Sequence, residues 1–256
     1  MIRRKTRKQL IVFDLDGTLA PSKSPLPDRM SELLNDLLAR FQVCVISGGK
    51  YELFQRQLLA NLPSYPERLA NLHLMPTNGT RYYAFEPKKS AWHQVYAENL
   101  TRQQKSKITK VLYDGLDELR WRPKQPWGEL IEDRGSQITL SALGQEAPIE
   151  AKEAWDPTGK KKEELRLVIT PKLPEFEVRS AGTTSIDVTK PGIDKAYGIR
   201  KLMQITDINK AETLFLGDRL AEGGNDYPVK AMGIDCLEVS HWEDTALIIQ
   251  AILYVA

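Results

Sequence analysis

The sequence predicts an α/β protein in which a Rossmann-like parallel sheet carries an inserted α+β domain. Two observations support this fold class. Short apolar runs alternate with amphipathic segments at both ends of the chain, as in a parallel sheet covered by helices on both faces. The middle of the chain instead alternates apolar and polar residues with a period of two, which is typical of an antiparallel sheet with one open face.

The first part of the core, residues 1–86, begins with an apolar run at 10–14 that predicts a strand ending in a glycine turn. Apolar side chains then recur at helical spacing between Met30 and Phe41, and Asp28 is the expected N-cap. Two more strands are predicted at 43–46 and 72–75, with a helix between them. This order of elements is that of a parallel sheet.

The second part of the core, residues 190–256, returns to the same order, and residues 87–189 form the inserted domain. We predict core helices at 195–205 and 246–255 and core strands at 213–216 and 236–239. The inserted domain contains two predicted helices, 102–119 and 160–168. Its predicted strands are 129–132, 137–140, 175–179 and 185–188.

The composition is that of an ordinary globular protein and by itself excludes few functions. The chain has 256 residues, of which 41% are hydrophobic and 27% charged, as in ordinary globular proteins. A formal net charge of +2 gives no indication of nucleic-acid binding. No apolar run approaches the roughly 20 residues of a membrane span. Cys44 and Cys236 lie in apolar stretches, and we expect buried free thiols and a cytoplasmic location.

Polar fragments follow the predicted strands, and in a parallel sheet the carboxyl ends of the strands share one edge. Asp14 and Asp16 are two residues apart, so extended backbone directs both to one side. Asp218 follows a later strand and adds a third carboxylate. Such a cluster is costly without a hard cation, and Mg²⁺ fits oxygen ligands. A single Asp-x-Asp-Gly is more often a surface turn, but the strand before it favours a metal site.

Two further fragments are suited to a phosphate group. Ser47 and Gly48 offer a hydroxyl and backbone N–H groups at a helix start, although an ordinary glycine-rich turn has the same composition. Lys195 begins a helix after Asp194, a candidate N-cap. Most lysines are simply solvated, but at the strand ends its ammonium would neutralise developing negative charge.

Taken together, residues 14–19, Ser47, Lys195 and the segment 217–226 resemble the motifs of the haloacid dehalogenase (HAD) superfamily, in the family's order and over nearly the whole chain. The inserted domain is similar to the large α/β cap of subfamily IIB. Within this group the chain is most similar to eukaryotic-type phosphomannomutases. The features that carry this similarity are the spacing of segment 217–226, the pair Asp194-Lys195 and the cap stretch 131–135.

The resemblance implies a Mg²⁺-dependent phosphoryl-transfer enzyme. Asp14 would be the nucleophile that forms an aspartyl-phosphate, and Asp16 would be the general acid and then the base. The carboxylates of Asp14 and Asp218 and the backbone carbonyl of Asp16 would bind Mg²⁺. Asn225 and Asp226 would support this metal shell.

The same resemblance implies the substrate contacts. The phosphoryl group would be held by four residues: Thr18, Ser47, Gly48 and Lys195. From the cap, Arg134, Ser185 and Asp187 would contact the part of a small phosphorylated substrate that does not react. We expect neither a nucleic-acid nor a membrane partner, and a monomer or homodimer.

One departure from the family decides between two activities. Gln145 stands where the mutases carry a cap arginine, and glutamine cannot replace a bidentate guanidinium. A mutase must retain a bisphosphorylated intermediate, so a weaker clamp favours release and hydrolysis. We therefore predict a phosphatase acting on a phosphorylated sugar or similar metabolite. A hexose phosphomutase is the alternative, and a non-catalytic binding module with the same fold is a third hypothesis.

Overall fold

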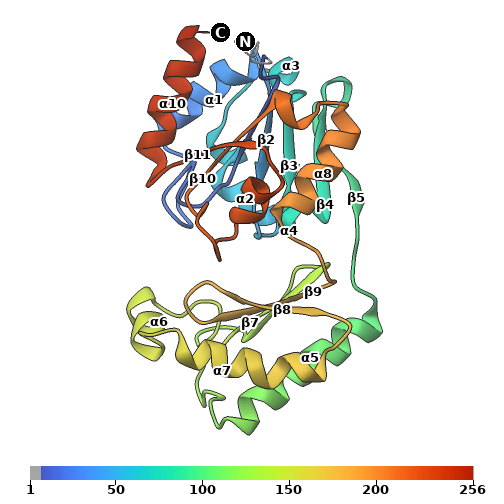
Figure 1. Ribbon diagram of the computed structural model, residues 1–256, viewed down its shortest axis with the longest axis vertical. Helices are drawn as coiled ribbons and strands as arrows, with labels where there is room; N and C mark the ends of the chain where they lie inside the picture. Colours follow the sequence, from blue (N-terminus) through green and yellow to red (C-terminus); the bar gives the residue numbers. More distant parts are fainter. Residues whose placement is uncertain (1–6, 256) are drawn as a thin grey trace. The chain divides into compact units, whose positions relative to one another are not determined.

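The computed structural model describes residues 7–255. They divide into two compact units: a core unit up to Ala97 and from Ile193 onward, and a cap unit, Glu98–Gly192 (Figure 1). The core unit is therefore assembled from two distant parts of the sequence.

The core unit contains a seven-stranded sheet in the order β11-β10-β1-β2-β3-β4-β5. Five strands are parallel: β1 (Leu10–Phe13), β2 (Gln42–Ile46), β3 (Leu72–Met75), β10 (Thr213–Gly217) and β11 (Asp235–Glu238). The hairpin of β4 (Arg81–Glu86) and β5 (Ala91–Ala97) extends the sheet with antiparallel strands. The predicted start of the inserted domain at residue 87 falls within this hairpin, whereas the second unit starts at Glu98.

Helices cover both faces of this sheet. They are needed there because successive side chains of a strand point to opposite faces and, in β1, both sets are apolar. Ile11 and Phe13 of β1 pack in one cluster with α1 (Asp28–Leu38) and α10 (Trp242–Val255), which lie side by side (Figure 1). Leu10 and Val12 face the opposite cluster, which includes α8 (Lys195–Thr206) and α9 (Tyr227–Ala231). Helix α1 starts at Asp28 itself, with Pro27 as its N-cap, so the predicted cap position was wrong by one residue.

The remaining core elements are short. They are the helices α2 (Tyr51–Gln57), α3 (Pro66–Leu69) and α4 (Pro76–Gly79) and the 3₁₀ turns η1 (Leu59–Asn61), η2 (Pro87–Lys89) and η4 (Lys210–Glu212). Among residues 7–255, no helix is both long and apolar enough to cross a membrane. Cys44 and Cys236 are free thiols.

The cap unit is a four-stranded antiparallel sheet with helices on one face. Its strands, in the order β6-β7-β9-β8, are β6 (Ile131–Asp133), β7 (Gln137–Ser141), β9 (Ser185–Thr189) and β8 (Glu177–Ala181). Ile138 and Ile186 pack against α5 (Arg102–Glu118) and α7 (Lys160–Ile169). The short elements α6 (Ile149–Trp155) and η3 (Thr170–Lys172) complete the unit. Alternate residues of the strands therefore present a polar second face.

Candidate active site

Three neighbouring parallel strands bring the predicted site residues to one edge of the core sheet. Asp14 follows β1, Ser47 follows β2 and Asp218 follows β10, and β1 pairs with both of the other strands. The backbone N–H of Asp14 donates to the carbonyl of Leu216 over 3.0 Å, which continues the β1–β10 pairing up to the site. The sheet topology thus gathers residues more than 200 positions apart.

A buried lysine between two aspartates forms the centre of this edge. The Nζ of Lys195 lies 2.5 Å from Asp14 Oδ1 and 2.5 Å from Asp226 Oδ1. The side chain of Lys195 is fully buried, and so is that of Asp226. Asp194 caps α8 by accepting from the N–H of Tyr197, which fixes the first turn that carries Lys195. Charges buried this deeply are tolerated only when they are paired.

The same edge offers a candidate metal site. Asp14, Asp218 and Asp226 each have a carboxylate oxygen, and these oxygens all lie within 4.8 Å of one another. Asp218 Oδ1 is buried and has no hydrogen-bond partner among the described residues. Three carboxylates face one ammonium, so the cluster retains negative charge. An oxygen-only donor set with an unpaired buried carboxylate oxygen fits a hard divalent cation.

The pKa values reflect this crowding. Burial raises the pKa of Asp14 to about 7, with a further contribution from Asp226, although Lys195 acts in the opposite direction. Burial and then the charge of Asp226 also raise the pKa of Asp218. Burial by itself would lower the pKa of Lys195, but the attraction of Asp14 and Asp226 raises it. A divalent cation would relieve the repulsion between these carboxylates.

Glycines allow the close approach of the two motif loops. Gly17 has a φ of +81°, and a Cβ there would lie 2.7 Å from Asp218 Oδ2. A Cβ at Gly217 would lie 2.4 Å from Asp226 Oδ2. Side chains at these positions would displace the carboxylates of the cluster.

Asp16 and Thr18 occupy the turn after β1. The Oδ1 atom of Asp16 accepts from the N–H of Lys23 over 2.6 Å and from Gln57 Nε2 over 3.3 Å. Its carboxylate is therefore not one of the three that converge. Thr18 is fully buried, and its hydroxyl has no hydrogen-bond partner among the described residues.

Ser47 and Gly48 form a tight turn after β2. Ser47 is buried, and its Oγ accepts from the N–H of Gly49 over 3.1 Å. The carbonyl of Ser47 accepts from the N–H of Asn78, which lies after β3. The turn is thereby fixed by the neighbouring strand. Asn225 is exposed, although its neighbour in the sequence, Asp226, is buried.

The polar face of the cap unit carries the predicted substrate contacts. Asp187 Oδ1 accepts from the hydroxyl of Thr139 over 2.7 Å, and Ser185 lies two residues earlier on the same strand. Burial raises the pKa of Asp187, against the opposite effect of Arg134. Arg134 forms an ion pair of 2.7 Å with Glu132. Arg179, which we did not predict as a site residue, lies opposite Asp187 in the β8–β9 register.

The side chain of Gln145 does not act as a substitute for an arginine on the polar face of the cap, because its amide is used within the cap. Its Nε2 atom donates to the carbonyls of Leu130 and Thr139, over 3.3 and 3.5 Å. The amide therefore stabilises the backbone of the cap.

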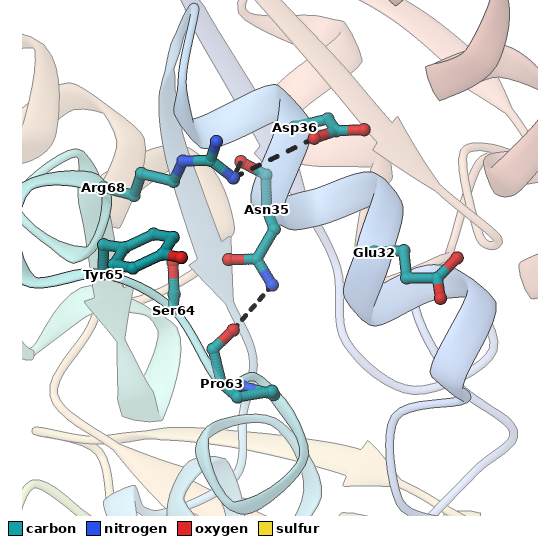
Figure 2. A pocket seen from close by; sticks show the side chains of 7 residues that line it. All are labelled: Glu32, Asn35, Asp36, Pro63, Ser64, Tyr65 and Arg68. Atoms are coloured by element: carbon teal, nitrogen blue, oxygen red, sulfur yellow. Dashed lines mark hydrogen bonds and ion pairs between the residues drawn. The ribbon is translucent and has the colours of Figure 1, made fainter.

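A separate pocket of about 640 Å³ lies on the core unit, between α1 and residues 63–68 (Figure 2). Asn35 donates from its amide to the carbonyl of Pro63, and Arg68 donates to the carbonyl of Asn35. None of the predicted site residues lines this pocket. The cluster around Lys195 remains the candidate active site.

Comparison with known proteins identifies the family. The family model for eukaryotic phosphomannomutase matches residues 30–255. The phosphomannomutase of Schizosaccharomyces pombe is 26% identical over 232 residues, which are 88% of this chain and 86% of that protein. Human phosphomannomutase 1 is 25% identical over 234 residues, covering 89% and 85%.

Solved structures support the fold. A haloacid dehalogenase-like hydrolase from Bacteroides thetaiotaomicron aligns with a TM-score of 0.67 and 16% identity over 96% of this chain and all of that one. The core sheet and the separate antiparallel cap sheet are those of the HAD fold, as predicted. The chain is a HAD-type phosphotransfer enzyme and belongs to the eukaryotic phosphomannomutase family.

Proposed function

We propose that this protein is a Mg²⁺-dependent hexose-phosphate mutase that works through an aspartyl-phosphate on Asp14. The observation that carries the proposal is the buried pairing of Asp14 with Lys195, in a chain whose family match spans both core and cap. We predicted a phosphatase from the sequence, with a mutase as the alternative. The relatives named phosphomannomutase favour the mutase.

The core residues have complementary roles in the proposed reaction. A carboxylate oxygen of Asp14 forms the bond to phosphorus while the bond from phosphorus to the sugar oxygen breaks. Asp16 gives a proton to the departing oxygen and takes a proton from the next hydroxyl that attacks. The ammonium of Lys195, next to Asp14, attracts the phosphoryl oxygens as charge develops on them.

The phosphoryl group would find further donors around Asp14. Thr18 follows the nucleophile Asp14 closely in the sequence, and its hydroxyl is buried without a hydrogen-bond partner among the described residues. Ser47 and the N–H of Gly48 lie at the end of the adjacent strand β2. Backbone and hydroxyl donors of this kind suit an anion.

The side chains of Asp14 and Asp218 and the backbone carbonyl of Asp16 would hold Mg²⁺, supported by Asn225 and Asp226. When bound, the cation neutralises charge on the phosphoryl oxygens. The unpaired Oδ1 of Asp218 supports this assignment.

The cap residues Arg134, Ser185 and Asp187 would hold the unreactive end of the sugar phosphate. A mutase must keep its bisphosphorylated intermediate bound while the two ends exchange. Gln145 supports hydrolysis as a second candidate function, because its amide donors are used on backbone carbonyls. The free thiols Cys44 and Cys236 fit the proposed cytoplasmic location.

The test follows both products in one reaction. Purified protein is incubated with Mg²⁺ and mannose or glucose 1-phosphate, with and without hexose 1,6-bisphosphate, and hexose 6-phosphate and inorganic phosphate are measured. A mutase forms 6-phosphate faster than inorganic phosphate and requires the bisphosphate, whereas a phosphatase releases inorganic phosphate alone.

The variant Asp14→Asn should abolish both products. Asp36→Asn, the same change at an exposed position of α1, should abolish neither. If the wild-type protein forms no product under any of these conditions, the proposed function is wrong.

A further inference from the structure

We infer that Thr77 is a positioning residue whose left-handed backbone orients the N–H of Gly48 toward the phosphoryl group, an inference that rests on the proposed function. Thr77 belongs to α4, the short segment that follows β3, and only 1% of the residue is exposed. It is part of none of the sequence motifs that predict the active site.

The backbone of α4 is unusual for residues that carry side chains. Thr77 has a φ of +49° and a ψ of +48°, and Asn78 has a φ of +55° and a ψ of +34°. Asparagine adopts this left-handed region readily, but a β-branched threonine is strained there. Among residues 7–255, Thr77 is the only β-branched residue with a positive φ. Such strain persists only where the surrounding structure imposes it, and it is concentrated at functional sites.

The left-handed conformation lets two successive N–H groups donate to the same loop. The N–H of Thr77 donates to the carbonyl of Gly49 over 2.9 Å, and the N–H of Asn78 donates to the carbonyl of Ser47 over 2.9 Å. In an extended strand, successive N–H groups point to opposite sides. Because peptide units are planar, the φ and ψ of Thr77 set the angle between these two N–H groups. An extended Thr77 would therefore lose one of the two hydrogen bonds.

These hydrogen bonds fix the direction of a proposed phosphate donor. In a trans peptide unit, the carbonyl of Ser47 and the N–H of Gly48 point in opposite directions. The carbonyl of Ser47 points to the turn after β3, so the N–H of Gly48 points away from β3. In the sheet, β2 lies between β3 and β1. The N–H of Gly48 is therefore directed to the side of β1, the strand that Asp14 follows.

The side chain of Thr77 stabilises its own strained backbone. Its Oγ1 lies 2.6 Å from the Oγ1 of Thr80, and both hydroxyls are buried. The Oγ1 of Thr80 donates to the carbonyl of Thr77 over 2.8 Å. Since a hydroxyl has one proton, Thr77 is the donor in the bond between the two hydroxyls. The hydroxyl of Tyr96 also donates to the carbonyl of Gly79 over 2.8 Å, which fixes the end of the turn.

The same turn packs on the helix that carries Lys195. A Cβ at Gly79 would lie 2.3 Å from the Cα of Gly198, so the two backbones are in direct contact. Gly198 lies in the first turn of α8, which begins at Lys195. The turn thus connects two groups that would hold the phosphoryl oxygens, the N–H of Gly48 and the ammonium of Lys195. A shift of its backbone would change their separation.

Two substitutions separate this role from packing. Thr77→Val keeps the size and the β-branching of the side chain but removes the hydroxyl that stabilises the strained backbone. Thr77→Gly removes the whole buried side chain, but glycine adopts a positive φ without strain. If Thr77 only filled space, valine would be harmless and glycine harmful. A positioning role gives the opposite order of reaction rates.

The rate is measured as single-turnover phosphorylation of the enzyme by hexose 1,6-bisphosphate with Mg²⁺. We expect Thr77→Val to lower this rate about 10- to 100-fold, since removal of a whole oxyanion donor costs about 100- to 1,000-fold. Thr77→Gly should react at least about five times faster than Thr77→Val, because its backbone can stay left-handed. The affinity for Mg²⁺, measured by calorimetry without phosphate, should change less than about twofold in both variants, because its ligand oxygens are unchanged.

Ser90→Val is the matched control. Ser90 also has a positive φ, +48°, but it is exposed and lies between β4 and β5. This variant should leave the phosphorylation rate unchanged. If Thr77→Val does not fold, Thr80→Val replaces it, because that variant removes the other hydroxyl of the pair and should slow the reaction in the same way.

A valine variant at position 77 or 80 that reacts as fast as the wild type would overturn the inference. So would a Thr77→Gly enzyme slower than Thr77→Val, or a slow Ser90→Val enzyme. A parallel loss of Mg²⁺ affinity in Thr77→Val would also overturn it, because the damage would then lie in the carboxylate cluster. All these outcomes need an active wild type and leave the proposed function standing. If the wild-type enzyme is not phosphorylated by the bisphosphate, the proposed function fails.

Discussion

Replacing Lys195 by methionine should destabilise the core unit strongly. The ammonium is fully buried and lies 2.5 Å from a carboxylate oxygen on each side, on Asp14 and Asp226. Its removal leaves two buried carboxylates that repel each other. Breaking a buried ion pair by removing one partner costs about 3–5 kcal/mol. Methionine fills most of the space, so we assign this loss to charge and not to a cavity.

Hydrogen exchange of the β1 and β10 amides, measured with a chelator present, reports the stability of the core unit alone. The double variant Lys195→Met/Asp226→Asn should regain at least about 1 kcal/mol, because Asp14 is then the only remaining carboxylate of the two that were paired with the ammonium. Lys210→Met, at an exposed lysine of the same unit, is the control. A loss below about 1 kcal/mol in Lys195→Met, or no recovery in the double variant, would refute this account of the buried pair.

Three further predictions concern pH, packing and metal binding. Burial lowers the pKa of His73 to about 4, so the unfolded chain binds a proton at a higher pH than the folded protein does. The free energy of unfolding should therefore fall by up to about 3 kcal/mol as the pH drops from 6.5 to 4. In His73→Gln, urea titrations should show no such dependence of the free energy of unfolding on pH. Gly198→Ala would place a Cβ 2.6 Å from Ile46 Cδ1 and 2.7 Å from the carbonyl of Asn78, and it should lower the free energy of unfolding by about 1–3 kcal/mol. A variant with an unchanged melting temperature would contradict that packing. Asp218→Asn should weaken Mg²⁺ binding, measured by calorimetry, at least about tenfold. In the presence of a chelator it should raise the melting temperature, because it relieves the repulsion between like charges. A lower melting temperature would show that the neighbouring carboxylates do not repel Asp218.

Most of the core could be predicted because its strands are short apolar runs that end at polar motifs. The run at 72–75 matches β3. In the cap, the helices predicted at 102–119 and 160–168 match α5 and α7 within a residue. Asp194 caps α8 as expected. The convergence of Asp14, Lys195 and Asp218 follows from topology, since parallel strands end at one edge.

Other features depend on tertiary contacts that local pattern does not contain. Strand β5, none of whose residues is fully buried, lies within the segment 87–189 that we predicted as the inserted domain, but it pairs with β4 in the core sheet. Asp226 was expected to support the metal shell, and its carboxylate lies in the buried cluster itself. Nothing in the sequence indicated that Gln57 contacts Asp16, because a glutamine near the end of an amphipathic helix is usually solvated.

The position of β1 in its sheet constrains how the protein can form during synthesis. β1 lies between β2, which follows it closely, and β10, which begins at Thr213. One side of this fully buried strand therefore has no partner until some 200 further residues have left the ribosome, a wait of roughly 10–40 s at ordinary translation rates. The cap, whose four strands all lie within residues 131–189, has its complete sequence earlier. The nascent chain thus has a complete cap sequence but an apolar side of β1 without its partner, the kind of surface that chaperones bind, until β10 has been synthesised.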